Sequence, residues 1–251
     1  MKQYMKNYEL KNLAKDRLEG RYGGAIRVLC LSYLISWLTR LVINNVAGNT
    51  MASVYSMTSS RNAAIAVSVF FNGLLLLATV ILGVMNAGIT LYFLNLASGQ
   101  QPVVKDLFYG FRNDSKKALG ISAALTLCHA VCLWPSQYLF QHFLEAQEAR
   151  WIMYALIALA IGLCVYVPIS LGISLSFYLM LDFPQNSGKE TLKLCWRLMQ
   201  GNRKRLFLLE LGFLPLLLLC LLSFGIGFLW LEPYMHMTYT CFFLDMMNPK
   251  N

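Results

Sequence analysis

The chain has 251 residues, of which 57% are hydrophobic and only 13% are charged, and its mean hydropathy is +0.53. A soluble domain carries about a quarter charged residues, so this composition excludes an ordinary soluble protein and indicates an all-α integral membrane protein. The net charge of +9 is concentrated in the N-terminal tail and the loops between apolar runs, where it meets lipid headgroups, and we therefore expect no nucleic-acid partner.

The first predicted element is a basic amphipathic surface helix at residues 8–20. Its apolar side chains recur at the spacing of one helical face, and lysine and arginine surround them. That pattern predicts a helix lying flat on the membrane surface, followed by a first span at 25–47 and a polar loop at 48–61. The apolar face consists of Leu10, Leu13, Ala14 and Leu18.

The second apolar run, at 63–97, is longer than a span requires. It contains Gly83 and Gly88, which serve either as bends or as close-packing sites. A second basic surface helix is predicted at 102–113, because apolar side chains fall on one helical face and charged side chains on the other. The apolar face consists of Val103, Val104, Leu107, Phe108 and Phe111.

Two further spans are predicted at 119–142 and 151–181, and each contains a proline, Pro135 or Pro168. Small residues in the second of these spans favour close contact with a neighbouring helix. They are Ala155, Ala158, Gly162, Ser170 and Ser174.

A third basic amphipathic helix is predicted at 188–200. Ser187 and Glu190 have the spacing of a capping box at its start, and Gly201 supplies a stop. Leu192, Cys195, Trp196 and Met199 form its apolar stripe. The candidate contacts to anionic lipid headgroups on this helix and at the membrane boundary after it are Lys189, Lys193, Arg197, Arg203, Lys204 and Arg205.

The last apolar run is too long for one span. A glycine-rich break divides it into a fifth span at 206–222 and a sixth at 225–246, joined by a tight turn. A single tilted helix that ends near Tyr234 is the alternative, which leaves five spans or six.

Together these elements predict one polytopic membrane domain over residues 1–251, with about six transmembrane helices arranged as three hairpins. Each hairpin follows a basic surface helix, so the plan is an approximate threefold repeat. The second arm of each hairpin ends in an aromatic pair, although an aromatic belt at the membrane interface explains these pairs equally well. The pairs are Tyr92 with Phe93, Phe177 with Tyr178, and Phe242 with Phe243.

Lysine and arginine are abundant in the N-terminal tail and in the loops at 98–117 and 182–205, and sparse in the other loops. The positive-inside rule therefore predicts a cytoplasmic N-terminus and, with six spans, a cytoplasmic C-terminus.

Several segments resemble a bacterial membrane family catalogued as domain of unknown function 975. They read LKNLAKDRLEGRYGGAI, LFYGF, FYLMLDFP, RLMQGNRKRLFLLEL, FGIGFLWLEPY and CFFLDM. The resemblance implies a bacterial cytoplasmic-membrane protein with five or six spans, and it carries no catalytic residues across. The run Phe213-Leu214-Pro215 departs from the family's aliphatic-Gly-Trp pattern, so the packing of the fifth span is expected to differ.

Four ionisable residues inside predicted spans are candidate functional residues, because such groups are costly in lipid. Glu232 and His236 are four residues apart and suit a proton relay or a cation site, but equally a satisfied polar pair in the bundle or a pair close to water. Glu210 is expected to pair with Arg203 or Arg205 near the surface, and His129 to be a buried hydrogen-bonding residue.

No Walker loop, GxSxG, HExxH or CxxC motif occurs in the sequence, so we expect no enzyme activity, cofactor or metal. The first functional hypothesis is an accessory or scaffold protein that interacts with anionic phospholipid headgroups, with a membrane-protein partner or a homo-oligomer. The second is a small-solute or ion transporter that uses Glu232 and His236.

Overall fold

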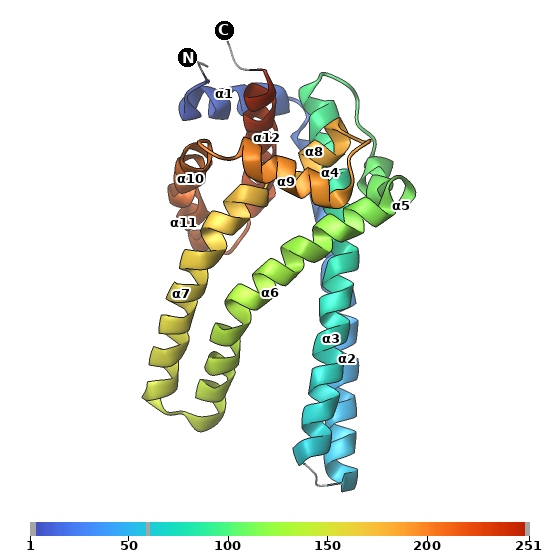
Figure 1. Ribbon diagram of the computed structural model, residues 1–251, viewed down its shortest axis with the longest axis vertical. Coiled ribbons are helices and arrows are strands. Elements are labelled where there is room, and N and C mark those ends of the chain that lie inside the picture. Colours follow the sequence, from blue (N-terminus) through green and yellow to red (C-terminus); the bar gives the residue numbers. More distant parts are fainter. Residues whose placement is uncertain (1–3, 59–60, 249–251) are drawn as a thin grey trace.

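Helices form the computed structural model, which describes residues 4–58 and 61–248 and contains no strand in those ranges. The chain leaves the end where both termini lie and returns to it three times (Figure 1). The first excursion consists of α1 (Asn7–Leu18), α2 (Tyr22–Thr58), α3 (Arg61–Gly83) and α4 (Met85–Ala97).

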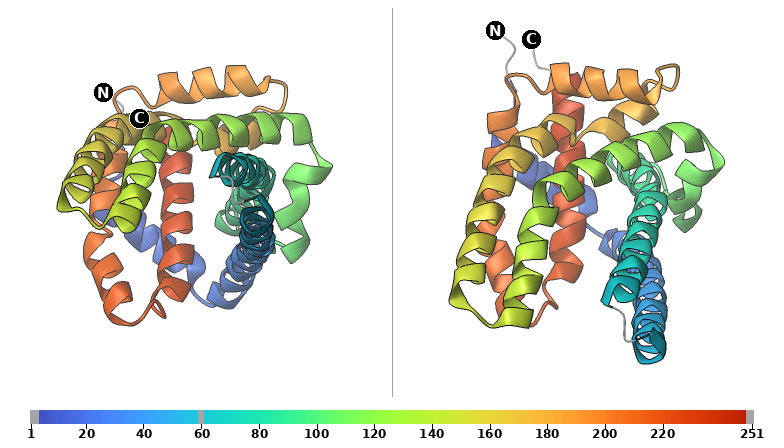
Figure 2. Two further views of the ribbon diagram at one scale, coloured as in Figure 1. Left: turned by 90° about the horizontal axis from the view of Figure 1, so that it is seen from below. Right: turned by 60° about the horizontal axis from the view of Figure 1, so that its bottom comes forward.

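The second and third excursions follow the same course. Helix α9, which opens the third excursion, lies across the end of the molecule (Figures 1 and 2). The second consists of the 3₁₀ helix η1 (Val104–Phe108), α5 (Tyr109–Arg112), α6 (Ser115–Ala146), α7 (Ala149–Ile173) and α8 (Ser176–Asp182). The third consists of α9 (Gly188–Leu198), α10 (Arg203–Leu211), α11 (Leu214–Leu222) and α12 (Phe228–Met247).

Five helical segments of the described chain are long and apolar enough to cross a membrane, which agrees with the first five predicted spans. They are Tyr22–Met57, Ile65–Ala97, Ser115–Leu144, Ala149–Asp182 and Arg203–Leu222. The predicted sixth span corresponds to α12, which is helical over 20 residues but is not one of these five.

The polar segment that follows the first predicted span is helical as far as Thr58, so the predicted loop at 48–61 is wrong over those residues. Its hydroxyl side chains bond to carbonyls one turn back, as Thr50 does to Val46 at 2.8 Å, and therefore do not interrupt the helix. With 37 residues α2 is about 55 Å long. The paired α2 and α3 extend well beyond the tip of the α6–α7 pair (Figure 1).

The predicted surface helix at 102–113 is also wrong, because the segment divides into η1 and α5. Leu107 is buried while Val103 and Phe111 are exposed, so the apolar residues do not share one face. The segment packs closely on α4 at Gly88, where a Cβ atom would overlap the backbone carbonyl of Leu107. Gly83 marks the junction between α3 and α4, as one of the two interpretations predicted.

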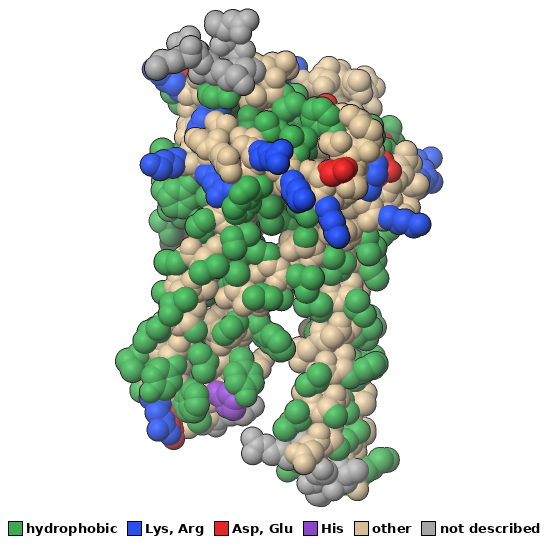
Figure 3. Space-filling model, viewed as in Figure 1, with side chains coloured by type: hydrophobic (Ala, Val, Ile, Leu, Met, Phe, Trp, Pro, Cys, Tyr) green, Lys and Arg blue, Asp and Glu red, His purple; other side chains and the backbone are tan. Residues whose placement is uncertain are grey.

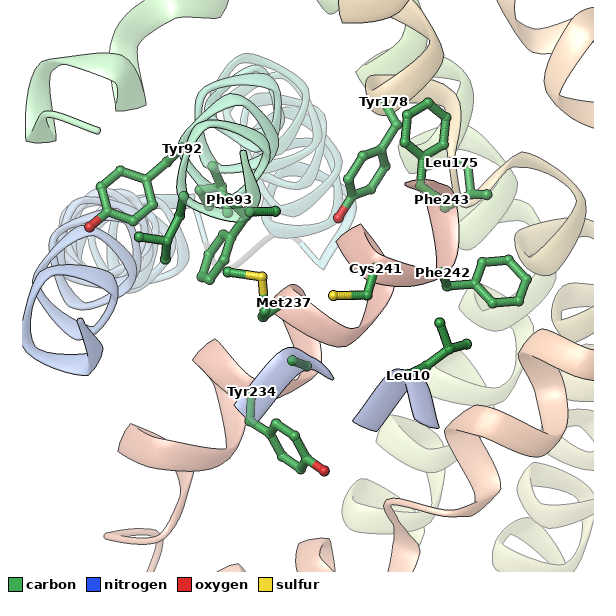
Figure 4. Close-up of a cluster of buried hydrophobic side chains, with 14 of the residues drawn as sticks. Leu10, Tyr92, Phe93, Leu175, Tyr178, Tyr234, Met237, Cys241, Phe242 and Phe243 are labelled. Atoms are coloured by element: carbon green, nitrogen blue, oxygen red, sulfur yellow. The ribbon is translucent and has the colours of Figure 1, made fainter. Parts of the chain in front are cut away.

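Helix α12 is the centre of the main core and contacts α1, α2, α4 and α11. The aromatic pairs that end the three returning arms are all buried, and Tyr178 contacts Phe243 with ring centroids 5.0 Å apart (Figure 4). An interfacial aromatic belt is therefore the wrong interpretation of these residues, because their rings pack inside the protein.

Helix α1 forms where it was predicted, but it packs on protein. Leu10, Ala14 and Leu18 are fully buried, and α1 packs against α12. Lys11 donates a hydrogen bond to the Gly212 carbonyl at 2.6 Å, and burial lowers the pKa of its ammonium. Arg17 likewise donates to the Ala97 carbonyl at 2.5 Å, so these two cations of α1 bind to other parts of the protein.

The glycine-rich break is a turn between α11 and α12, and Gly225 adopts a φ of 87° there. The alternative of one tilted helix ending near Tyr234 is therefore wrong. A second break, between α10 and α11, falls at Gly212 and Phe213, where the run Phe213-Leu214-Pro215 that departs from the family pattern begins.

Candidate functional site

Helix α9 begins at Gly188, as the sequence predicted, and ends at Leu198, two residues before the predicted end. The Ser187 hydroxyl accepts from the Glu190 backbone N–H, and the Glu190 carboxylate accepts from the Ser187 N–H at 2.8 Å. This hydrogen bonding holds the pKa of Glu190 below its usual range. The chain leaves the helix through Gly201, which has a φ of 89°.

The face of α9 that points inward is fixed to the protein. Thr191, Cys195 and Met199 are buried, and α9 packs across α6, α7 and α8. Trp196 differs from the prediction, because the residue is 36% exposed and is not buried with Cys195 and Met199 of the apolar stripe.

The opposite face of α9 carries three exposed cations at four-residue spacing, which we call the α9 stripe: Lys189, Lys193 and Arg197. Figure 3, viewed as in Figure 1, shows lysine and arginine side chains in a band across the end of the molecule where α9 lies, with apolar surface below the band. Lys204, just beyond α9, is exposed as well. Four of the six predicted headgroup contacts are thus accessible.

The remaining two predicted headgroup contacts, Arg203 and Arg205, are engaged inside the protein. The Arg203 guanidinium lies 3.8 Å from the centre of the Trp196 ring, in a cation–π contact that joins α10 to α9. Arg205 pairs with Asp245 at 2.5 Å and donates to the Met5 carbonyl at 2.8 Å. The expected pairing of Glu210 with either arginine is therefore wrong.

Glu232 and His236 lie on one face of α12, as their spacing predicted. The His236 Nε2 is 3.9 Å from the Glu232 Oε2, too far for a hydrogen bond. The Tyr33 hydroxyl of α2 donates to the same carboxylate at 2.9 Å, and His236 stacks on Phe93 at 5.3 Å. Tyr33 had no sequence signal that singled it out, because it is one of many aromatic residues in an apolar span.

Three cavities with mainly apolar linings adjoin this cluster. One of about 290 Å³ is lined by Glu232, and another of about 500 Å³ by Tyr33, Arg40 and His236. A third, of about 280 Å³, is lined by His236 and Glu210.

His129 does not join the cluster. Its side chain is exposed on α6, with the ring edge-on to Tyr166 at 5.5 Å, so the expectation that it is buried is wrong. Among the described residues, no group of three or more His, Cys, Asp and Glu side chains gathers as a metal site.

Comparison with known proteins identifies one family. The model described as "Protein of unknown function (DUF975)" matches residues 1–250. No curated protein and no solved structure matches the chain.

Proposed function

The chain belongs to the DUF975 family of proteins of unknown function, and from that premise we propose that it is a non-enzymatic membrane protein that binds anionic phospholipid through the α9 stripe. The observation that carries this proposal is the asymmetry of α9. Its apolar face is held by the protein body, so its three exposed cations form a fixed array. Each cation near an anionic membrane surface contributes about 1 kcal/mol of attraction.

The proposal places the chain in a bacterial cytoplasmic membrane with six spans, in three hairpins. Both termini and α9 are assigned to the cytoplasmic side by the positive-inside rule, and they share one end of the molecule. An accessory or scaffold role, with a membrane-protein partner or a second copy of the chain, fits a protein whose fixed cations recruit anionic lipid.

The first test removes the α9 stripe. The triple variant Lys189→Gln, Lys193→Gln, Arg197→Gln is expected to bind phosphatidylglycerol about tenfold to a hundredfold more weakly, from the loss of up to three headgroup contacts. The measurement is a thermal-shift titration of the purified full chain in neutral detergent, with phosphatidylcholine as the reference lipid.

The matched control neutralises three other cations predicted on the same side, Lys105, Arg112 and Lys116. It removes the same charge and is expected to retain most of the binding. An equal loss in both variants would assign the effect to net charge and remove the α9 stripe from the proposal.

A second candidate function is ion transport, and the cluster of Tyr33, Glu232 and His236 favours it. These residues adjoin three cavities, and a carboxylate and an imidazole on one helix face are groups that relay protons.

For transport, Glu232→Gln is expected to abolish protein-dependent proton flux into proteoliposomes that contain a pH-sensitive dye, under an imposed potential. Glu148→Gln, an exposed carboxylate at the α6–α7 turn, is the control and should retain the flux. If wild-type protein conducts no more than empty vesicles, or Glu232→Gln conducts as well as wild type, transport through this cluster is ruled out.

A further inference from the structure

The cavity of about 280 Å³ lies where five parts of the fold meet, and its lining includes Glu210, which neither proposed function uses. Its wall is formed by α4, α6, the junction of α7 with α8, α10 and α12. Helix α9 packs across three of these elements, α6, α7 and α8. The lining is mainly apolar and aromatic, with a few polar groups: Asn86, Thr90, Ser174, Glu210, His236 and Tyr239.

Glu210 is the one formally charged carboxylate among the residues that line this cavity. Its side chain is half-buried, and within residues 4–58 and 61–248 it has no hydrogen-bond partner and no ion pair. The two preceding arginines have other partners. Arg203 contacts Trp196, and Arg205 pairs with Asp245. No lysine or arginine of the described chain lines the cavity, so the carboxylate lacks a counter-ion from the protein.

An unpaired carboxylate in a partly apolar site is costly unless it is neutralised. A bare divalent metal ion is a poor candidate, because it requires several oxygen or nitrogen ligands and no such group gathers among the described residues. An organic ammonium needs only one carboxylate together with aromatic faces. Phe177, Tyr178 and Tyr239 place aromatic side chains in the same wall.

The size of the cavity limits the ligand. A volume of about 280 Å³ equals that of about nine water molecules at roughly 30 Å³ each, which suits a ligand of about that many non-hydrogen atoms. Asn86 and Ser174 on its wall are exposed, so the cavity is reached from outside.

We propose that this cavity binds a small organic cation, an ammonium that carries an apolar or aromatic group, with Glu210 as its counter-ion. The aromatic side chains enclose the apolar group, and Asn86, Ser174 and Tyr239 offer oxygen acceptors to the remaining ammonium hydrogens. The proposal does not rest on lipid binding or on transport, because a ligand can occupy the cavity without either.

The test uses benzylammonium, which has eight non-hydrogen atoms, as the probe. Equilibrium dialysis of the purified full chain with the radiolabelled probe is expected to show saturable binding that Glu210→Gln weakens at least about thirtyfold, as the loss of a charge-assisted contact implies. Glu148→Gln removes an equal charge from the exposed α6–α7 turn and should bind as wild type does. Benzyl alcohol and benzoate, which lack the positive charge, should not compete.

A measurement on the unaltered chain keeps the proposal testable if Glu210→Gln does not fold. Dicyclohexylcarbodiimide labels carboxyl groups in apolar surroundings, and mass spectrometry of the labelled wild-type protein locates the modified residue. Benzylammonium is expected to protect Glu210 from labelling at concentrations that saturate binding, while benzyl alcohol does not. Absence of saturable binding, binding that Glu210→Gln leaves unchanged, or equal protection by the neutral alcohol would each overturn the proposal, while lipid binding by the α9 stripe would be unaffected.

Discussion

Replacing Asp245 by alanine is expected to lower the free energy of unfolding by about 3–5 kcal/mol, the usual cost of leaving one member of a buried ion pair without its partner. The side chains of Asp245 and Arg205 are only 3% and 16% exposed. The carboxylate also accepts from the Met5 backbone N–H at 3.2 Å. The variant thus leaves a guanidinium without its counter-ion and frees the segment that leads into α1.

Thermal and denaturant unfolding of the purified chain in detergent measures this loss. Glu148→Ala is the control, because its pair with Arg150 is exposed and such pairs contribute about 0–1 kcal/mol. The double variant Arg205→Met, Asp245→Leu should recover much of the stability, since an apolar pair replaces an ion pair. If Asp245→Ala is no more destabilising than Glu148→Ala, Arg205 and Asp245 do not anchor the fold.

Replacing Gly162 by leucine is expected to destabilise the protein by about 3 kcal/mol, the upper end of the usual cost of overpacking. Gly162 of α7 is buried, and a Cβ atom there would overlap the Cys132 carbonyl of α6. Since the obstacle is backbone, the two helices must separate to make room.

The control for this variant is Gly73→Leu on α3, where a Cβ atom meets nothing within 4 Å. It adds the same side chain to a helix with open space around it and is expected to change the unfolding temperature little. An equal shift in both variants would show that the close contact between α6 and α7 contributes nothing specific to stability.

Local signals predicted the features that depend on neighbouring residues. The capping box at Ser187 and Glu190 and the stop at Gly201 located α9, because both act through hydrogen bonds and dihedral angles within a few residues. The small-residue face predicted the contact at Gly162 for a similar reason, since the need for a small side chain is visible at the position itself.

Signals that depend on distant parts of the chain were missed. Arg205 and Asp245 are 40 residues apart, and nothing near either residue indicates the other. Hydropathy placed Glu210 inside a span, but it did not show that the nearest arginines, Arg203 and Arg205, contact Trp196 and Asp245 instead of Glu210. The apolar face of α1 had the pattern of a membrane-surface helix, because burial against lipid and burial against α12 select the same spacing.

The central position of α12 has a consequence for biosynthesis. The aromatic pair of α4, Tyr178 of α8 and the buried face of α1 share one core with α12, a helix that the ribosome completes after every one of them. Earlier hairpins therefore enter the membrane with their core-facing side chains still uncovered, and they remain targets for proteolytic quality control until α12 arrives. Nascent chains truncated before Phe228 should accordingly be degraded far faster than the full chain, even though the five long apolar segments found in the described chain are already present.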